Sequence, residues 1–495
     1  MTTHVDEETP LLGSQQATKK TPLPWFQFSL VLFLQLSEPL TSNVIYPFAP
    51  QLIRDIGITH GNESQVGYYV GLMQSLFFLG QACTVLHWSR ISDRVGRKPV
   101  ILSGLFGLCF CMYGFGLSRT FWGLVLCRSL SGALMRLNGL SNICYSMMAE
   151  MTDSTNLAQA YAYFPIAWSS GTTLGPMIGG FLSRPAEQFP EWFGDSEFHK
   201  KYPYFLACSV PATFTIVAWL ATYFFLKETV ASPTPVSELL FSKKKYDDSK
   251  SPILSPGPSE PSSSSSSLHE NTSSDDGKPL PLRSLLTRNV ILAAGNYASL
   301  SLVDIAYRAI QPVFLSTPIE LGGLGLPPSS IGNVLSFFGI VNGILQVFFF
   351  ARIQRRFGSK RVFLTGIISS IPLVLMFPLI NHLARKQGLS TLVWALVYSQ
   401  VALSVLVSVS YGAIFIFITA ASPNRASLGA TNGFSQMTVS LMRAIGPALV
   451  ATVWSLTIEH NYLHGQLVYL VLIGVSLVSV FVGSLLPSEM KSNLD

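Results

Sequence analysis

Residues 87–102 read His-Trp-Ser-Arg-Ile-Ser-Asp-Arg-Val-Gly-Arg-Lys-Pro-Val-Ile-Leu, a short charged turn between two apolar stretches. One apolar stretch, near 66–86, precedes the turn, and another, near 99–118, follows it. The turn is too short to be a soluble domain, so the pattern predicts a hairpin between two membrane helices. Its four Lys and Arg residues against the single acid Asp93 predict a cytoplasmic location, because Lys and Arg resist translocation.

The composition of the whole chain indicates a polytopic membrane protein. Of its 495 residues, 49% are hydrophobic and only 12% are charged. Such a chain is too apolar for one soluble domain and too long for a single-span anchor. The net charge of +6 lies largely in short loops beside apolar segments, where membrane orientation explains it, so we expect no nucleic-acid partner.

Apolar segments of about 20 residues, enough to cross a bilayer core of ~30 Å, recur along the chain. There are about twelve, and they predict an all-α fold with six helices before and six after a polar linker. Their approximate limits are 25–46, 66–86, 99–118, 122–148, 159–182, 203–226, 288–315, 330–351, 362–382, 390–420, 427–456 and 466–486.

The polar segments divide the chain. Residues 1–23 are predicted to be a disordered cytoplasmic tail. In it, Glu7, Leu11 and Leu12 match the pattern of an acidic di-leucine sorting signal, and a chance match to so short a pattern is the equally weighted alternative. Residues 228–287, rich in Ser and Pro, are predicted to be a disordered cytoplasmic linker. The two halves are then 24–227 and 288–488, with a cytoplasmic tail at 489–495.

Charge also predicts the orientation of the remaining loops. The loop after the eighth segment is basic, whereas the loop between the fifth and sixth is acidic. Both termini are therefore expected in the cytoplasm. The sequon that begins at Asn62 then faces the lumen or the exterior and is a predicted glycosylation site.

Landmarks repeat between the two halves. Glu38 precedes Pro47 by nine residues, and Asp304 precedes Pro312 by eight. The turn Arg-Val-Gly-Arg-Lys at 94–98 is echoed by Arg-Phe-Gly-Ser-Lys at 356–360, and Gly-Pro at 175–176 is echoed at 446–447. These landmarks fit a parallel duplication of six helices with a substrate site near the midplane between the halves.

The turn motif Ser-Asp-Arg-Val-Gly-Arg-Lys at 92–98 resembles the signature loop between helices 2 and 3 of the major facilitator superfamily. The family pattern usually has Gly where this chain has Ser89. The resemblance implies a twelve-helix major facilitator fold in two six-helix halves. Arg94, Gly96, Arg97 and Lys98 would belong, with Asp93, to a charge network that closes the cytoplasmic side. Glu150 and Asp153 are the expected acidic partners of its arginines.

A second motif lies in the fifth segment, Gly-Thr-Thr-Leu-Gly-Pro-Met-Ile-Gly-Gly at 171–180. It resembles the helix-5 motif of antiporters in this superfamily, which implies outward transport. Glycines at three- and four-residue spacing also allow close helix approach, and proline bends a helix, so a packing seam is the alternative. The residues that match the motif are Gly171, Gly175, Pro176, Gly179 and Gly180.

Ionisable side chains inside the apolar segments cost about 2.5–3.5 kcal/mol each and therefore need a partner or a task. Glu38 is a predicted proton-coupling or substrate-cation site, with a structural hydrogen-bond acceptor as the alternative. Asp304 and Arg308 are one helical turn apart, which allows either an internal ion pair or a coupling role.

Three further arginines lie in these segments. Arg128, followed four residues later by Gly132, resembles the helix-4 motif of the superfamily, which implies a part in proton transfer. Arg136 and Arg443 are candidates for binding an anionic group of the substrate, or else they pair or snorkel. Aromatic and polar residues of the apolar segments are expected to line the cavity, with helix packing as the alternative for most of the aromatic ones: Asn43, Tyr46, Gln74, Tyr145, Trp168, Tyr307, Gln311, Asn342, Gln346, Tyr411, Asn432 and Gln436.

Local phrases elsewhere resemble the fungal and plant branch that includes the zinc-induced-facilitator-like transporters, for example Glu-Pro-Leu at 38–40 and Thr-Asn-Gly-Phe-Ser-Gln at 431–436. The eight histidines are scattered, and no metal or cofactor site is predicted. No nucleophile–base constellation indicates an enzyme.

The leading hypothesis is a monomeric, proton-coupled antiporter in the plasma or vacuolar membrane. It would export a small organic molecule such as a drug, toxin or secondary metabolite. Proton-coupled uptake and a non-transporting receptor are the alternatives.

Overall fold

The computed structural model describes residues 22–137, 156–229, 286–423 and 427–487, together with 144, 147–148, 150–152 and 284. All regular secondary structure in these residues is helical. The tail and linker motifs, including Glu7, Leu11 and Leu12, lie outside them, as do Asp153 and the side chains of Asp93, Arg94 and Arg136.

Twelve long helical segments are found among the described residues, which confirms the predicted fold class. Eight of them are long and apolar enough to cross a membrane. The N-terminal half comprises α1 (Trp25–Asn43), α3 (Ser64–Val95), α4 (Arg97–Leu117), α5 (Phe121–Leu137), α7 (Leu157–Phe181) and α11 (Phe205–Phe225). The C-terminal half comprises α14 (Arg288–Ser316), α15 (Pro328–Ile344) with η2 (Leu345–Phe349) and α16 (Phe350–Phe357), α17 (Ser359–Ile368) with α18 (Ser370–Gln387), α19 (Thr391–Ala421), α20 (Leu428–Glu459) and α21 (Leu467–Ser484).

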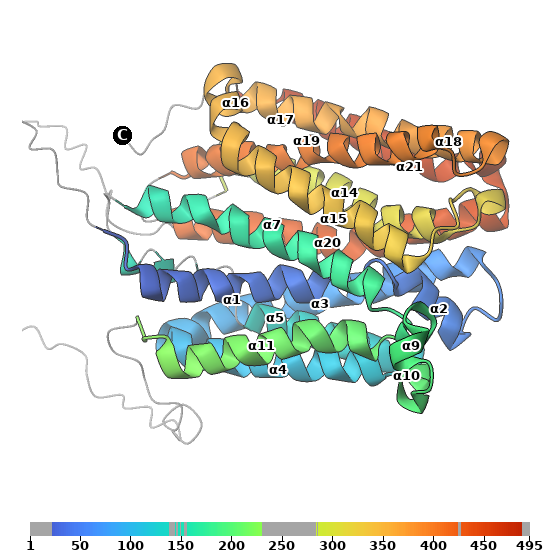
Figure 1. The fold of residues 1–495 in the computed structure, drawn as a ribbon. Coiled ribbons are helices and arrows are strands. Elements are labelled where there is room, and N and C mark those ends of the chain that lie inside the picture. The colour runs from blue at the N-terminus through green and yellow to red at the C-terminus, as the bar shows by residue number, and fades with distance from the viewer. Residues whose placement is uncertain are drawn as a thin grey trace, which may run out of the picture.

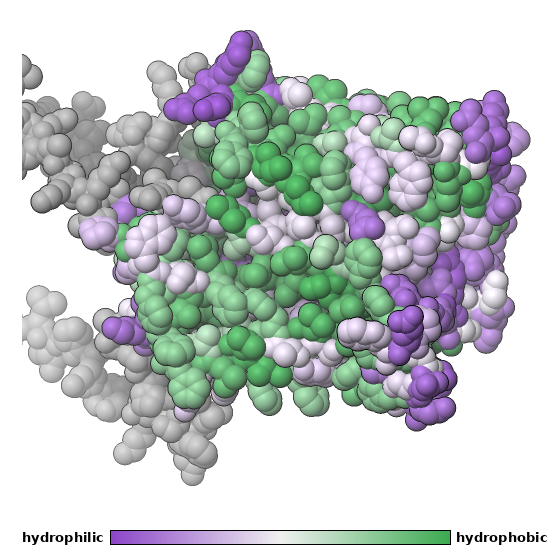
Figure 2. Space-filling model, viewed as in Figure 1, coloured by the Kyte–Doolittle hydropathy of each residue, from purple (hydrophilic) through white to green (hydrophobic). Residues whose placement is uncertain are grey.

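The long helices run roughly side by side, so the molecule has two ends (Figure 1). We call one the basic end; it holds the start of α1 and the turn between α16 and α17, at the left of Figure 1. The other, which we call the opposite end, holds α2 (Ala49–Ile56), α8 (Pro185–Gln188), α9 (Pro190–Phe193) and α10 (Glu197–Lys201). Figure 2 shows hydrophobic side chains over the flank between these ends, as expected for a surface in contact with lipid.

The charged turn of the sequence is much tighter than expected. Helix α3 continues through most of it to Val95, and α4 begins at Arg97, so Gly96 alone separates them. Gly96 has a φ of 109°, which side-chain-bearing residues rarely adopt. The repeat holds here: Gly358, with a φ of 78°, alone separates α16 from α17. The short turn predicted from charge is therefore a one-residue break.

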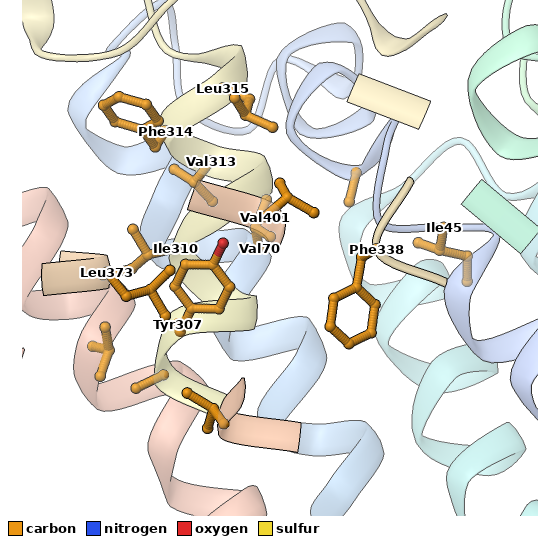
Figure 3. Close-up of a cluster of buried hydrophobic side chains, with 14 of the residues drawn as sticks. Ile45, Val70, Tyr307, Ile310, Val313, Phe314, Leu315, Phe338, Leu373 and Val401 are labelled. Atoms are coloured by element: carbon orange, nitrogen blue, oxygen red, sulfur yellow. The ribbon is translucent and has the colours of Figure 1, made fainter. Parts of the chain in front are cut away.

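The two halves contact each other toward the opposite end. Helix α3 packs on α20 and α7 packs on α15 in extensive cross-half contacts. One large buried apolar cluster is continuous across both halves, whereas a second one, near the basic end, is formed by N-terminal-half residues alone. Figure 3 shows part of the continuous cluster, with Ile45 and Val70 of the N-terminal half near Val313 and Phe338 of the other.

Candidate functional site

A polar stripe runs along one face of α14. It consists of Tyr297, Ser301, Asp304, Arg308 and Gln311, spaced alternately by four and three residues. This spacing places all five on one helical face. The stripe leads from the side of the basic end toward the closed contacts between the halves.

The predicted pairing of Asp304 with Arg308 is present. Arg308 Nε lies 2.9 Å from Asp304 Oδ1, and the hydroxyl of Tyr411 donates to Asp304 Oδ2 at 3.1 Å. The Asp304 side chain is 12% exposed and that of Arg308 31% exposed. Arg308 also lies over the ring of Phe338, with its Cζ 4.4 Å from the ring centroid. Both carboxylate oxygens of Asp304 therefore have donors, while Arg308 keeps an exposed flank.

Arg443 of α20 reaches the same stripe one turn nearer the basic end. Its Nε donates to Ser301 Oγ at 3.2 Å, and it interacts with Tyr411 and Tyr297. Gln436, two turns earlier on α20, donates to the hydroxyl of Tyr297 at 3.2 Å. Arg443 is partly exposed, and the ion pairs of the described residues do not include it.

A cavity of about 60 Å³ lies between the two halves. That space holds a few water molecules, since one water needs about 10–15 Å³ by this measure. Helices of both halves line it: Asn43, Tyr46, Thr172 and Pro176 come from the N-terminal half, and Arg308, Gln311, Leu335 and Phe338 from the C-terminal half. Of the residues expected to line the cavity, Asn43, Tyr46 and Gln311 are among them. The stripe of α14 thus ends in a cross-half cavity.

The N-terminal half places its own charged groups close to this cavity. Arg128 is 3% exposed; its Nη2 lies 3.4 Å from the Ser42 carbonyl oxygen, and its Cζ lies 4.0 Å from the Phe77 ring centroid. Glu38 lies one turn before Ser42 on α1, partly buried beside Pro39 and near Cys144. The described contacts of Arg128 thus go to the backbone of α1 and to an aromatic ring.

The glycine motif of α7 forms two packing seams. A Cβ on Gly171 would overlap Pro39, and one on Gly179 would overlap the carbonyl oxygen of Val44, so this face lies directly on the α1 segment. Gly175 packs on the same segment, with a built Cβ 3.0 Å from the Leu40 carbonyl oxygen. On the other face, a Cβ on Gly180 would lie 2.6 Å from the Pro328 carbonyl oxygen of the C-terminal half. The motif therefore serves close packing both within and between the halves.

Two glycine–proline contacts join the halves in matching ways. A Cβ on Gly332 of α15 would lie 2.6 Å from the carbonyl oxygen of Pro176, and a Cβ on Gly71 of α3 would lie 2.6 Å from that of Pro447. Pro176 and Pro447 belong to the repeated Gly-Pro landmark. The duplication detected in the sequence therefore reappears as a symmetric pair of close helix contacts.

The charge network at the basic end is partly as predicted. Arg97 Nη2 lies 3.1 Å from Glu150 Oε1, with Thr229 donating to the other oxygen of that carboxylate. Glu228 was not anticipated: its carboxylate accepts the backbone N–H groups of Arg97 and Lys98, each at 2.9 Å. These contacts cap the start of α4 and stay within the N-terminal half.

Comparisons with known proteins agree with this architecture. Residues 31–447 match the sequence profile of the Major Facilitator Superfamily. The chain belongs to the major facilitator superfamily. It is 31% identical over 94% of its length, and over 90% of the relative, to the "Major facilitator-type transporter psiT2" of Psilocybe cubensis. It is 30% identical to "Protein ZINC INDUCED FACILITATOR-LIKE 1" of Arabidopsis thaliana, with 87% and 84% of the two chains covered. The predicted fungal and plant branch is thereby confirmed.

Other members of the superfamily extend the picture. The chain is 29% identical to the "Efflux pump azaK" of Aspergillus niger, covering 99% of this chain and 98% of that one. Among solved structures, a D-xylose-proton symporter aligns with a TM-score of 0.65 at 12% identity, over 94% of this chain and 99% of that one. Because the identity is only 12%, the likeness to the symporter structure shows a shared fold and nothing more.

Hydrogen bonds between Arg54 and Ser316 join the two halves at the opposite end, and they were not predicted from the sequence. Arg54 of α2 donates to Ser316 at the end of α14, to its Oγ at 2.6 Å and to its carbonyl oxygen at 3.1 Å. Glu63 forms an ion pair with the same guanidinium, with its Oε2 2.9 Å from Arg54 Nε. Arg54 stands in a loop-flanking helix of eight residues, and no motif marks it.

The neighbouring residue anchors α2 to its own half. Asp55 accepts from Arg184 Nη2 at 2.6 Å and from the hydroxyl of Tyr204. Burial and the neighbouring Asp55 raise the pKa of Tyr204, so its phenol stays protonated and donates. Burial opposes the charge of Arg184, but Asp55 and Tyr204 outweigh it and raise the pKa of the guanidinium. Helix α2 is thus fixed to the N-terminal half by one residue and to the C-terminal half by the next.

Asn62 lies at the same end and is exposed. Asn62 Oδ1 accepts hydrogen bonds from the backbone N–H of Ser64 at 3.0 Å and from the Ser64 hydroxyl at 2.7 Å. The sequon is therefore on an accessible turn, and its glycosylation stays a prediction.

Proposed function

We propose that this protein exports a small organic molecule from the cytosol in exchange for protons. The observation that carries the proposal is the cavity between the halves, with α1 and α7 on one side and α14 and α15 on the other. Two halves that close at one end around a central site suit alternating access. The likeness to a protein named as an efflux pump supports the outward direction.

The basic end is the cytosolic one in this proposal. Lys98, Arg355 and Lys360 lie in the helix ends that flank the one-residue breaks there, while Glu187 and Glu191 belong to the short helices of the opposite end. This distribution follows the positive-inside rule. Since the cross-half contacts gather at the opposite end, the structure corresponds to a state closed toward the lumen or exterior.

Two carboxylates within the membrane are the candidates for proton coupling. Asp304 is held by Arg308 and Tyr411 at the inner face of α14. Glu38 lies on α1 beside Pro39, where a bend in the helix axis can change its surroundings. Protonation of Glu38 removes a charge from the hydrocarbon region, whereas protonation of Asp304 leaves Arg308 without its ion-pair partner. Either change in charge can alter the relative free energies of the two access states.

The glycine motif of α7 supports outward transport only through its resemblance to the motif of antiporters. Its glycines pack against α1 and the start of α15, and such contacts serve a transporter of either direction. The plasma and vacuolar membranes are both compatible with this proposal, because each separates the cytosol from a more acidic space.

The test is transport in sealed inside-out vesicles that contain the purified protein, with an acidic interior and a panel of labelled amphipathic compounds. We expect accumulation that depends on the pH gradient and is lost in Glu38→Gln or in Asp304→Asn. Glu187→Gln is the matched control, since its side chain is 66% exposed in a loop helix. Gradient-dependent accumulation that survives in both interior variants would exclude these two carboxylates as coupling groups. Absence of accumulation for every compound would reject export.

A further inference from the structure

We propose that the transported molecule carries an anionic group, a carboxylate, phosphate or sulfate, and that Arg443 binds it. This inference rests on the proposed function, because it assumes that a molecule passes between the two halves. It assigns a substrate class and a recognition residue to the polar stripe of α14.

The first observation is an imbalance of charge. Among the described side chains, the middle of the membrane-crossing helices contains three arginines, at positions 128, 308 and 443, and two acids, at positions 38 and 304. One arginine and one acid already form the pair between Arg308 and Asp304. Charges in the hydrocarbon region are costly unless they are compensated. An incoming anion lowers this cost, whereas an incoming cation raises it.

The second observation concerns which arginine remains available. Arg128 is 3% exposed and lies against a backbone carbonyl and a ring. Arg308 lines the cavity and keeps an exposed flank, but its charge is balanced by Asp304, and its Nη2 lies 3.3 Å from Ser408 Oγ. Arg443 is partly exposed, and within the described part of the chain no carboxylate lies within 4.0 Å of its nitrogens.

Asp304 interacts with the charge of Arg443 at longer range, but the two side chains form no ion pair within 4.0 Å. The two oxygens of Asp304 are occupied by Arg308 and by the hydroxyl of Tyr411. A guanidinium carries five N–H donors, and here the neutral side chains of Ser301 and Tyr411 use only part of them. The planar fork of such a side chain suits a carboxylate or phosphate better than any other group.

The surroundings of Arg443 indicate the rest of the molecule. Tyr297 lies edge-on to Tyr411, with ring centroids 6.0 Å apart, and next to Phe415, with centroids 5.2 Å apart. Aromatic walls of this kind favour a flat apolar body. The site therefore fits an amphipathic organic anion with its charged group at Arg443.

The test measures binding to the full-length purified protein by isothermal titration. The probes are 2-naphthoate, 2-naphthyl phosphate and 2-naphthyl sulfate, with 2-naphthamide and 2-naphthol as neutral analogues of the same shape. We expect at least one anion to bind about ten- to hundredfold more tightly than the neutral analogues, the usual effect of a charge-assisted hydrogen bond. Arg443→Gln should remove this preference, and Arg443→Lys should retain part of it.

Arg355→Gln is the matched control, because it removes the same charge from an exposed side chain at the basic end. Equal binding of neutral and anionic probes, binding by none of the three anions, or a preference that persists in Arg443→Gln overturns the proposal. Should Arg443→Gln fail to fold, the wild-type preference and Arg443→Lys decide the matter.

The vesicle assay separates this inference from the proposed function. Anion preference in the purified protein without gradient-driven accumulation rejects proton-coupled export alone. Gradient-driven accumulation of neutral or cationic compounds, without any anion preference, rejects the anionic substrate alone.

Discussion

Replacing Gly71 by alanine tests whether the contact between α3 and α20 holds the opposite end closed. A Cβ at this position would overlap that of Ala451 and lie 2.6 Å from the Pro447 carbonyl oxygen. The backbone of α20 cannot rotate away as a side chain can, so the two helices must separate. Overpacking of this kind costs about 1–3 kcal/mol, and only in the closed state.

The expected shift follows from that cost. A difference of 1–3 kcal/mol changes the ratio of open to closed molecules by about 5- to 150-fold. The intrinsic gain from replacing glycine within a helix, about 0.5–1 kcal/mol, is the same in both states and cancels. Gly71→Ala should therefore raise the population that is open at the opposite end.

A cysteine at Ser455 reports this population. Ser455 is 6% exposed, and its Oγ accepts the backbone N–H of Tyr68 across the two halves at 3.0 Å. In nanodiscs, a maleimide should label Ser455→Cys about 5- to 150-fold faster when Gly71→Ala is added, as long as closed molecules still predominate. The parent protein with serine at 455 gives the background from native cysteines.

Gly433→Ala on α20 is the matched control, since an added Cβ there meets no atom within 4 Å. It should leave the labelling rate of Ser455→Cys unchanged. The reasoning fails if Gly71→Ala labels no faster than Gly433→Ala does.

Three further predictions concern stability. Gly179→Ala would force a Cβ onto the Val44 carbonyl oxygen within one half, so the midpoint of thermal unfolding should fall in both access states; an unchanged midpoint would contradict the packing role. Asp304→Asn should destabilise the protein by about 3–5 kcal/mol, because it leaves Arg308 without its ion-pair partner. Adding Arg308→Gln should restore much of this loss, and additive losses of unfolding free energy in chemical denaturation would refute the reasoning. Tyr204→Phe should cost about 1.5–3 kcal/mol through the lost hydrogen bond to the Asp55 carboxylate, and equal unfolding free energies would argue against that bond.

Much of this fold could be predicted from local sequence. Apolar runs of sufficient length determined the helices, and the i, i+4 spacing of Asp304 and Arg308 fixed their pairing, because both depend only on helix geometry. The repeated Gly-Pro landmark likewise indicated matching positions, which the structure places at the two contacts between the halves.

The cross-half contacts could not be predicted in the same way. Arg54 and Ser316 are 262 residues apart, and their hydrogen bond exists because the halves are closed at one end. Glu228 caps α4 from a distance of about 130 residues in sequence, at the start of a polar segment that composition alone assigns to a linker. Such contacts depend on the arrangement of whole helices, and hydrophobic periodicity carries no information about them.

The ion pair of α14 has a consequence for how the protein is made. Asp304 and Arg308 belong to one helix, so their pair forms as soon as that turn forms, before the later helices of the C-terminal half have been synthesised. Helix α14 can therefore enter the bilayer with its charges already compensated. Arg443 has no acidic neighbour on its own helix within two turns, and its described partners are on α14 and α19. Stable insertion of α20 is therefore expected to require that the earlier helices of the C-terminal half are already in place, which gives membrane assembly of this half a definite order.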